Sequence, residues 1–215
     1  MENLNYWKNR YENLKSTGTV GNMKWNNDYN DEQKKVFQKI EEILSSNVDK
    51  NKIVIDFGCG LCNYLNSIKK ITEYKKCYCY DVIEIPLEES KKRYGDDNTN
   101  FILYKDDTEI NKFDYGFIFF TLQHVMSDEE FINILIKIKS SMNSKGKLFI
   151  FDNISDNKDL PYMRFRNYDE HEYLFIKSGF NCKKIDVINI TGQDVCLFEL
   201  TKKVQNESKR NINRI

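Results

Sequence analysis

The sequence lacks several features that would assign it to a class of protein directly. It has 33 basic and 33 acidic residues and a formal net charge of +0, so the basic surplus typical of nucleic-acid-binding domains is absent. No apolar run is long enough to span a bilayer, and residues 1–14 lack the apolar centre of a signal peptide. These absences predict a cytoplasmic protein that has neither a nucleic-acid nor a membrane partner.

Six cysteines are present, but their pattern does not predict a metal or redox centre. Cys59 and Cys62 form a C-x-x-C pair inside a glycine-containing turn, and the next pair, Cys77 and Cys79, has a single residue between them in a strand-like run. Neither the spacing nor the context matches a zinc or dithiol motif. We therefore expect free thiols and no metal site.

The length of 215 residues predicts one domain with a sizeable core. Residues 1–47 are expected to form an N-terminal helical cap of that domain, and residues 48–201 its core. Residues 202–215 are polar and basic without apolar periodicity, which predicts a disordered tail. Periodicity and turn residues predict helices near 3–15, 31–45, 61–71, 86–93, 127–142 and 170–178, and strands near 53–57, 76–81, 101–104, 113–120, 147–152, 182–190 and 194–201.

The chain is organised around residues 53–62, which read Ile-Val-Ile-Asp-Phe-Gly-Cys-Gly-Leu-Cys. The apolar run suits a strand that is buried on both faces of a parallel sheet. Gly58 and Gly60 allow a sharp turn and a close approach of a ligand to the backbone. A strand, a glycine turn and a helix together form the nucleotide-binding crevice of open α/β sheets.

The glycine pattern separates two classes of nucleotide ligand. A dinucleotide fingerprint requires a third glycine where this chain has Asn63, which counts against a nicotinamide oxidoreductase. The run Asp56-x-Gly58-x-Gly60 instead resembles motif I of the class I S-adenosylmethionine-dependent methyltransferases. Cys62 stands where that family usually has another small residue, which is a mild departure because cysteine is small and packs like an apolar residue.

The resemblance implies a cofactor site for S-adenosylmethionine along this edge of the sheet. In the family the glycine turn admits the amino-acid part of the cofactor, and Asp56 would fix its ammonium. Asp81 ends the next strand about 20 residues past the glycines, where an acid can accept hydrogen bonds from both ribose hydroxyls. The expected cofactor-binding residues are Trp7, Tyr11, Asp56, Gly58, Cys59, Gly60, Asp81, Val82, Asp106, Asp107 and Thr121.

Two of these assignments depend on the resemblance alone. An acid after the third strand reaches the adenine in the family, and either Asp106 or Asp107 fits that place. Trp7 and Tyr11 share one face of the first helix, within a W-x-x-R-Y segment that looks like the N-terminal cap of several small-molecule methyltransferases. They would close the site over the cofactor, or else pack on the core.

One of the two histidines is expected beside the reacting groups. His124 follows the strand near 113–120, and ligands of open α/β sheets bind at the carboxyl ends of strands. The L-Q-H run after this strand is typical of the resembled family. His124 either accepts a proton near neutral pH or only shapes the pocket. His171 lies at an acidic helix start and is expected to be solvated.

Substrate recognition is expected between the strand near 147–152 and the following helix, as the resemblance implies. That segment holds Tyr162, Arg164 and Arg166, and a mixture of arginine and aromatic residues suits an anionic or planar substrate. Residues 121–124 contain no proline. They therefore lack the Asn/Asp-Pro-Pro-aromatic motif that is common in enzymes methylating amide or adenine nitrogens.

The expected fold is a Rossmann-like, seven-stranded, mainly parallel sheet with helices on both faces, an antiparallel edge strand and the helical cap. The expected activity is methyl transfer from S-adenosylmethionine, with S-adenosylhomocysteine as product, to an oxygen or nitrogen of a small molecule. Two alternatives stay open, a methyltransferase acting on protein α-amino groups and a non-catalytic module that binds the cofactor. The first is weakened by Asn63, where an arginine is usual, and by Phe120, where a tryptophan is usual.

Overall fold

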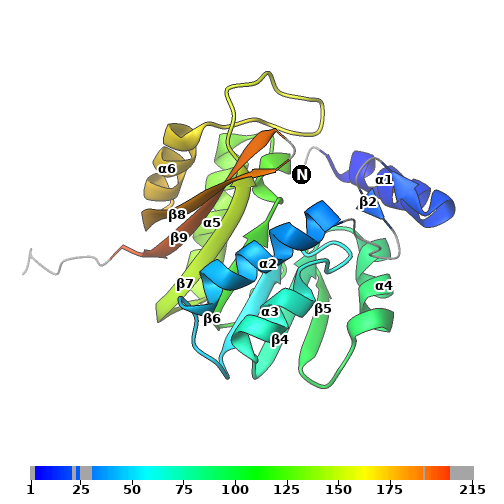
Figure 1. The fold of residues 1–215 in the computed structure, drawn as a ribbon, viewed down its shortest axis with the longest axis horizontal. Helices are drawn as coiled ribbons and strands as arrows, with labels where there is room; N and C mark the ends of the chain where they lie inside the picture. Colours follow the sequence, from blue (N-terminus) through cyan, green and yellow to red (C-terminus); the bar gives the residue numbers. More distant parts are fainter. Residues whose placement is uncertain (1–2, 21–22, 25–30, 191, 204–215) are drawn as a thin grey trace, which may run out of the picture.

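The computed structural model describes residues 3–20, 23–24, 31–190 and 192–203 (Figure 1). From residue 204 onward, the tail predicted as disordered lies outside these residues. A seven-stranded sheet forms the centre, in the order β5-β4-β3-β6-β7-β9-β8. Its strands are β3 (Ile53–Phe57), β4 (Lys76–Asp81), β5 (Thr99–Leu103), β6 (Phe113–Phe119), β7 (Met142–Asn153), β8 (Phe180–Ile190) and β9 (Gln193–Lys202).

Strand direction follows the predicted pattern. The pairs from β5 to β7 are parallel, whereas β9 runs antiparallel to both β7 and β8. The hairpin of β8 and β9 therefore forms one edge of the sheet. Strand β8 is the outermost strand, and the antiparallel β9 lies between β7 and β8. A separate two-stranded sheet is formed by β1 (Thr19–Val20) and β2 (Met23–Lys24). The seven-stranded, mainly parallel prediction is confirmed.

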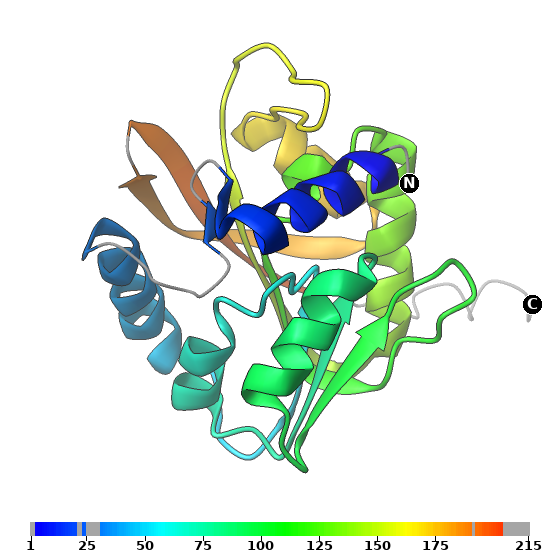
Figure 2. The ribbon, with the colours of Figure 1, turned by 90° about the vertical axis from the view of Figure 1, so that its right-hand side faces the viewer.

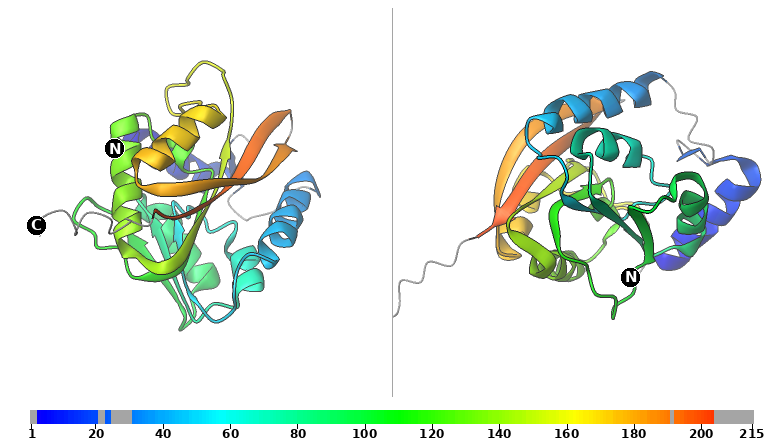
Figure 3. Two further views of the ribbon diagram at one scale, coloured as in Figure 1. Left: turned by 90° about the vertical axis from the view of Figure 1, so that its left-hand side faces the viewer. Right: turned by 90° about the horizontal axis from the view of Figure 1, so that it is seen from below.

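Helices cover both faces of the sheet (Figures 1 and 3). One face packs on α2 (Asp31–Ser45), α3 (Leu65–Thr72) and α4 (Glu84–Tyr94), through side chains such as Ile40, Ile68 and Leu87. The other face packs on α5 (Asp128–Ser141) and α6 (Tyr168–Lys177), through Phe131 and Phe175 among others. The strands are apolar on both faces because both faces are covered.

The N-terminal helix α1 (Leu4–Thr17) lies across the carboxyl end of the sheet (Figure 2). Its Tyr11 and Leu14 are buried against Leu61, from the glycine turn, and Ile83, from the end of β4. The helix ends at Gly18, which takes the left-handed conformation and donates its N–H to the Leu14 carbonyl at 2.9 Å. The cap is thus anchored directly on the segments expected to hold the cofactor. Among the described helices, none combines the length and the apolar character needed to cross a membrane.

The helix predicted from residue 61 begins later, at Leu65. Cys62 has a φ of 53°, which lies in the left-handed region and cannot continue a right-handed helix. Its N–H donates to the Cys59 carbonyl at 2.8 Å, and the Leu65 N–H donates to the Cys62 carbonyl at 3.1 Å. These tight turns delay the helix by one turn. Strand β7 begins earlier than predicted. It starts at Met142, before the turn that the sequence predicts at residues 145–146.

The prediction that His171 is solvated is wrong. Its side chain is 1% exposed and packs among Phe131, Phe175 and Phe198. Its Nδ1 donates to the Asn167 carbonyl at 3.0 Å, and its Nε2 lies 3.7 Å from a carboxylate oxygen of the buried Asp152. The acidic neighbours suggested a solvated helix start, but position 171 lies on the face of α6 that turns to the core.

Candidate active site

A cavity of about 700 Å³ opens at the carboxyl ends of the central strands, beneath α1. This volume lies within the range of ligand pockets. Its wall combines α1, α2, the glycine turn, the ends of β4 and β6, the short helix η1 (Leu122–His124), the 154–167 loop and the β8–β9 hairpin. The predicted site residues on this wall are Trp7, Tyr11, Asp56, Gly58, Cys59, Gly60, Asp81, Val82, Thr121, His124 and Tyr162. The cavity lining does not include Asp106, Asp107, Arg164 or Arg166.

Neighbouring side chains leave no room for a Cβ at either glycine of the turn. Gly58 has a φ of +77°, and a Cβ there would meet the Cβ of Thr121 at 2.8 Å and overlap the rest of that side chain. Gly60 has a φ of +52°, and a Cβ there would lie 2.6 Å from the Tyr11 hydroxyl. Both positions thus exclude side chains for conformational and steric reasons. The turn is thus in contact with Thr121, which follows β6, and with Tyr11 of α1.

Asp81 is held by the turn as a hydrogen-bond acceptor. Its Oδ2 accepts from the Gly60 N–H at 2.8 Å, and its Oδ1 accepts from the Ile83 N–H at 2.9 Å. Burial raises the pKa of Asp81 to about 6, although these backbone donors act to lower it. Each oxygen retains a second lone pair, so the carboxylate is fixed in place and can still accept from a hydroxyl in the cavity.

Asp56 is a buried acid at the end of β3, only 4% exposed. Burial is the main cause that raises its pKa well above the ordinary range, and the neighbouring Cys62 and Asp81 add to the shift. A carboxyl group in such a place becomes ionised when a cation approaches it. The chain therefore offers a place for a positive group at the base of the cavity.

The cap helix contacts the opposite wall through aromatic rings. Trp7 packs edge-on against His124, with ring centroids 4.4 Å apart and an interplanar angle of 68°. Tyr6 stacks on Tyr162, with centroids 4.5 Å apart and an angle of 3°. The Asn3 side chain also donates to the His124 carbonyl at 3.2 Å. In this arrangement α1 closes the cavity against η1 and the 154–167 loop.

Both ring nitrogens of His124 have partners. Nδ1 lies 2.9 Å from the Tyr162 carbonyl, which can only accept, so Nδ1 carries the proton. Nε2 is then the acceptor, and the Gln123 amide donates to it at 3.2 Å. Burial lowers the pKa of His124, and the bond to Tyr162 opposes this shift. A neutral imidazole with its lone pair on Nε2 is the form suited to accept a proton.

Gln123 and Asn153 are site residues that the sequence interpretation missed. The Asn153 amide donates to the Gln123 side-chain oxygen, which fixes the Gln123 NH₂ toward His124. Both residues line the cavity. Their position at the carboxyl ends of neighbouring strands is the signal that could have found them, because ligand sites gather at that edge.

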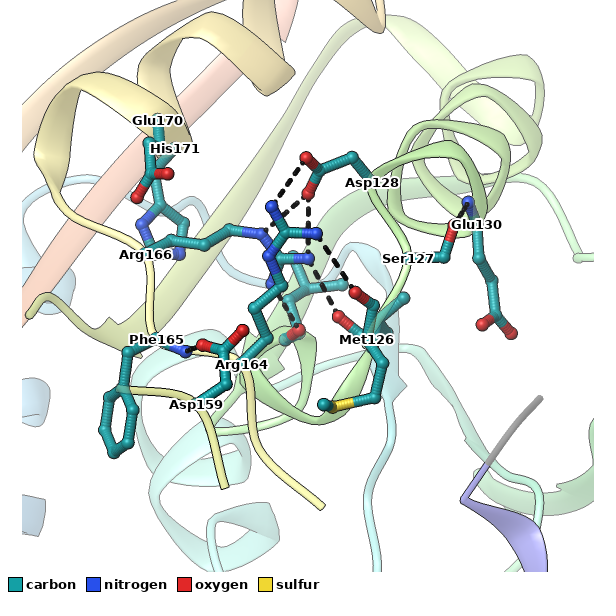
Figure 4. A network of polar contacts seen from close by, with 12 residues as sticks. Met126, Ser127, Asp128, Glu130, Asp159, Arg164, Phe165, Arg166, Glu170 and His171 are labelled. Carbon is teal, nitrogen blue, oxygen red and sulfur yellow. Dashed lines mark hydrogen bonds and ion pairs between the residues drawn. The ribbon is translucent and has the colours of Figure 1, made fainter. Parts of the chain in front are cut away.

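Arg164 and Arg166 point toward Asp128 (Figure 4), and neither lines the cavity. Arg166 is 1% exposed; its guanidinium donates to Asp128 at 3.1 Å and to the Val125 carbonyl at 2.8 Å. Arg164 donates to Asp128 at 2.9 Å and to the Met126 carbonyl at 3.1 Å. These arginines join the 154–167 loop to the start of α5. In this conformation they hold the wall of the cavity, and the guanidinium of each donates to Asp128 and to backbone carbonyls.

Asp106 and Asp107 are both exposed, beyond the end of β5. Asp106 lines a surface depression beside Ser127 and Lys137, which adjoins the main cavity and shares Tyr104, Glu130 and Ile134 with its wall. The cavity wall nearest to this segment is formed by Tyr104 and Ile134 instead. The structure therefore brings neither acid to the cavity.

An aromatic part of the cavity wall next to the glycine turn was also missed. Tyr64 stacks on Phe120 with centroids 6.1 Å apart and packs edge-on against Phe37 at 5.0 Å. Ile190 and Val195 extend this wall from the β8–β9 hairpin. These residues lie on four different segments, so no single run of sequence indicates that they meet.

The topology explains why the cavity is where it is. Strand β3 pairs with β4 on one side and with β6 on the other. The strand order therefore reverses at β3, and ligands of open α/β sheets bind at such a switch point, outside the carboxyl ends of the strands. The glycine turn follows β3 directly.

Comparison with known structures identifies the architecture. The DhpI–SAH complex matches with a TM-score of 0.70 at 15% sequence identity, covering 95% of this chain and 97% of that one. Magnesium protoporphyrin IX methyltransferase (ChlM) from Synechocystis PCC 6803, with bound SAH, matches with a TM-score of 0.68 at 12% identity, covering 92% and 97%. The chain has the class I methyltransferase fold.

This chain resembles known proteins less in sequence than in fold. Des-methyl DIF-1 methyltransferase A of Dictyostelium discoideum is 26% identical in an alignment of length 166 that covers 65% of this chain. The match spans 44% of that relative, so this chain covers less than half of its length. No family model matches the sequence.

Proposed function

We propose that this protein transfers a methyl group from S-adenosylmethionine to an oxygen or nitrogen of a small molecule. The observation that carries the proposal is the buried Asp81, held by the turn's backbone within the cavity of a class I methyltransferase fold. The names of the relative and of the structural neighbours, which include methyltransferases and SAH complexes, support the same reading.

The residues present fit this cofactor by their chemistry. A carboxylate at Asp81 suits the two ribose hydroxyls, and a buried carboxyl at Asp56 suits an ammonium. Trp7 and Tyr11 supply aromatic surface above the turn, which favours a sulfonium. When bound, S-adenosylmethionine supplies an activated methyl group, so the chain itself has to position the acceptor and exclude water.

His124 would accept the acceptor's proton at Nε2. The Tyr162 carbonyl keeps His124 Nδ1 protonated, and the Gln123 amide occupies the position from which a donor reaches Nε2. An acceptor hydroxyl or amine that replaces this amide would place its proton on His124 and its lone pair toward the cavity. The mostly apolar, aromatic wall at Tyr64 and Phe120 favours an uncharged, planar acceptor over a charged one.

Calorimetric titration with S-adenosylhomocysteine, beside NAD as a control, tests the cofactor. We expect the wild type to bind S-adenosylhomocysteine alone, and the Asp81→Ala variant to bind it more weakly. A folded, ligand-free protein that does not bind it would refute the proposal. An acceptor screen with phenols, small amines and a peptide with a free N-terminus then separates the small-molecule assignment from the protein alternative. Cofactor binding without turnover of any acceptor, and without an effect of His124→Ala, would favour a binding module.

A further inference from the structure

A compact group of thiols lies beneath the glycine turn, on the sheet face covered by α2 and α3. The Sγ atoms of Cys62 and Cys79 and a carboxylate oxygen of Asp56 lie within 4.8 Å of one another, and all three residues are buried. Cys59 belongs to the same turn as Cys62, and its Sγ donates to the Gly60 carbonyl at 3.9 Å. Asp56, Cys59, Cys62 and Cys79 are called the thiol cluster below. Each of its cysteines is a free thiol.

The fold assembles the thiol cluster from two segments whose spacing alone predicts no metal site. Asp56 on β3 pairs in register with Cys79 on the neighbouring β4, so the two side chains lie next to each other on one face of the sheet. The turn then brings the C-x-x-C pair back over them, since the Cys62 N–H donates to the Cys59 carbonyl at 2.8 Å. Cys62 adopts a φ of 53°, where glycine is the less strained residue, and presents a thiol there.

We propose that the thiol cluster binds one thiophilic metal ion of the zinc type, with the ligands Asp56, Cys59, Cys62 and Cys79. Tetrahedral zinc sites have metal–sulfur distances of about 2.3 Å and metal–oxygen distances of about 2.0–2.2 Å. Ligand atoms around such an ion are separated by about 3.5–3.8 Å. The ligand atoms of Asp56, Cys62 and Cys79 lie within 4.8 Å of one another, so small side-chain rotations would bring them to these distances, and a rotation of the Cys59 side chain would supply the fourth ligand.

Metal binding would release the thiol protons to solvent as the thiolates form. The N-terminal turn of α3 follows Cys62 closely, and its partial positive charge favours the thiolate form of a cysteine. Asp56 and Cys59 line the main cavity, which gives the ion a path of entry.

The metal site and the proposed cofactor site share Asp56, and this part of the inference rests on the proposed function. A carboxylate bound to a divalent cation is no longer available to an ammonium. We therefore expect the metal-loaded protein to bind S-adenosylhomocysteine more weakly than the metal-free protein does. Metal binding itself does not depend on the cofactor assignment.

Titration of the reduced full-length chain with Cd²⁺ tests the site, because cadmium–thiolate bonds absorb in the ultraviolet. We expect one ion per chain in the wild type, and at least a tenfold loss of affinity in Cys62→Ser and in Cys79→Ser. Cys182→Ser is the matched control, because Cys182 lies on β8 outside the thiol cluster, and its binding should equal the wild type. Absence of binding by the wild type, or equal affinity in all four proteins, would overturn the proposal.

X-ray absorption of the Zn²⁺-loaded wild type gives a second measurement that needs no variant to fold. We expect a first shell of three sulfurs at about 2.3 Å and one oxygen at about 2.0–2.2 Å. A shell of nitrogen and oxygen alone would place the ion elsewhere and overturn the proposal. Unchanged S-adenosylhomocysteine affinity after loading would remove Asp56 from the ligand set, whereas failure of the metal-free protein to bind it would refute only the proposed function.

Discussion

The two sides of the cavity are built in different ways. The turn side, residues 56–61 and 81–83, is held by backbone donors that converge on the single carboxylate of Asp81. The loop side, residues 122–124 and 154–167, is held by side chains that reach backbone carbonyls, as Arg166 does at Val125 and His124 does at Tyr162. The turn side therefore depends on main-chain conformation, and the loop side on the identity of individual side chains.

This difference predicts two kinds of mutational effect. A substitution on the turn side should impair the backbone that we propose holds the cofactor, and the loss should appear in cofactor binding. A substitution on the loop side should leave the turn intact and appear in stability or in turnover of the acceptor. The four variants below test this division, from the largest expected effect to the smallest.

Gly58→Ala is expected to have the largest effect. The added Cβ would overlap Thr121 at a φ of +77°, which combines backbone strain with overpacking and should cost about 2–4 kcal/mol of unfolding free energy. Binding of S-adenosylhomocysteine should be lost. Chemical denaturation and calorimetry measure the two effects. Gly192→Ala is the control, because it has a φ of +84° but no atom within 4 Å; equal destabilisation of both variants would contradict the steric argument.

Arg166→Leu should destabilise the protein by about 2–3 kcal/mol, because it removes a fully buried guanidinium that donates to Asp128 and to the carbonyl groups of Leu122 and Val125. Arg164 would remain as a donor to Asp128, and the Val125 N–H as a donor to the Leu122 carbonyl. Cofactor affinity at a temperature where the protein is folded should stay near the wild-type value. Thermal unfolding compares it with Arg164→Leu, whose side chain is 29% exposed and whose loss should cost about 1 kcal/mol or less. Unchanged stability with a raised acceptor KM would instead support substrate contact by Arg166.

Asp81→Asn should weaken S-adenosylhomocysteine binding about tenfold, since a carboxylate that accepts from hydroxyls is lost. In the wild type the pKa of Asp81 is about 6, so affinity should fall as the pH is lowered through about 6. Because the folded state raises this pKa, the protonated carboxyl stabilises the protein at low pH, and that contribution is lost as the pH rises through about 6. Calorimetry between pH 5 and 8 should find no such step in the variant; identical pH profiles would contradict the assignment.

Gln123→Leu should change kcat/KM about fivefold, the effect of one hydrogen bond of about 1 kcal/mol, with cofactor affinity unchanged. In the acceptor-free enzyme the Gln123 donor favours neutral His124, so its removal should raise the pKa of the histidine and shift the acid limb of the kcat/KM profile to higher pH. Gln193→Leu, on the cavity wall from β9, is the control. Superimposable acid limbs in all three proteins would show that Gln123 does not act on His124.

The turn side could be predicted because its contacts are encoded by short motifs. The apolar run before Asp56 and the two glycines indicate a buried strand and a tight turn, and the spacing to Asp81 indicates an acid beside it. The loop side could not be predicted in the same way. Arg166 and Asp128 are 38 positions apart, and a mixture of arginine and aromatic residues in a loop is equally compatible with a substrate site and with a structural clamp.

The sequence by itself determined the strand and glycine turn at residues 53–62, the class of the fold and most of the residues on the turn side. These features depend on local periodicity and backbone conformation, which are properties of neighbouring residues. Only the tertiary structure decided that His171 is buried, that the arginines bind Asp128, and that Cys79 meets the C-x-x-C pair beside Asp56. Strand register and helix packing set these contacts. Both depend on how distant segments bury their apolar surfaces together, which no single stretch of sequence specifies.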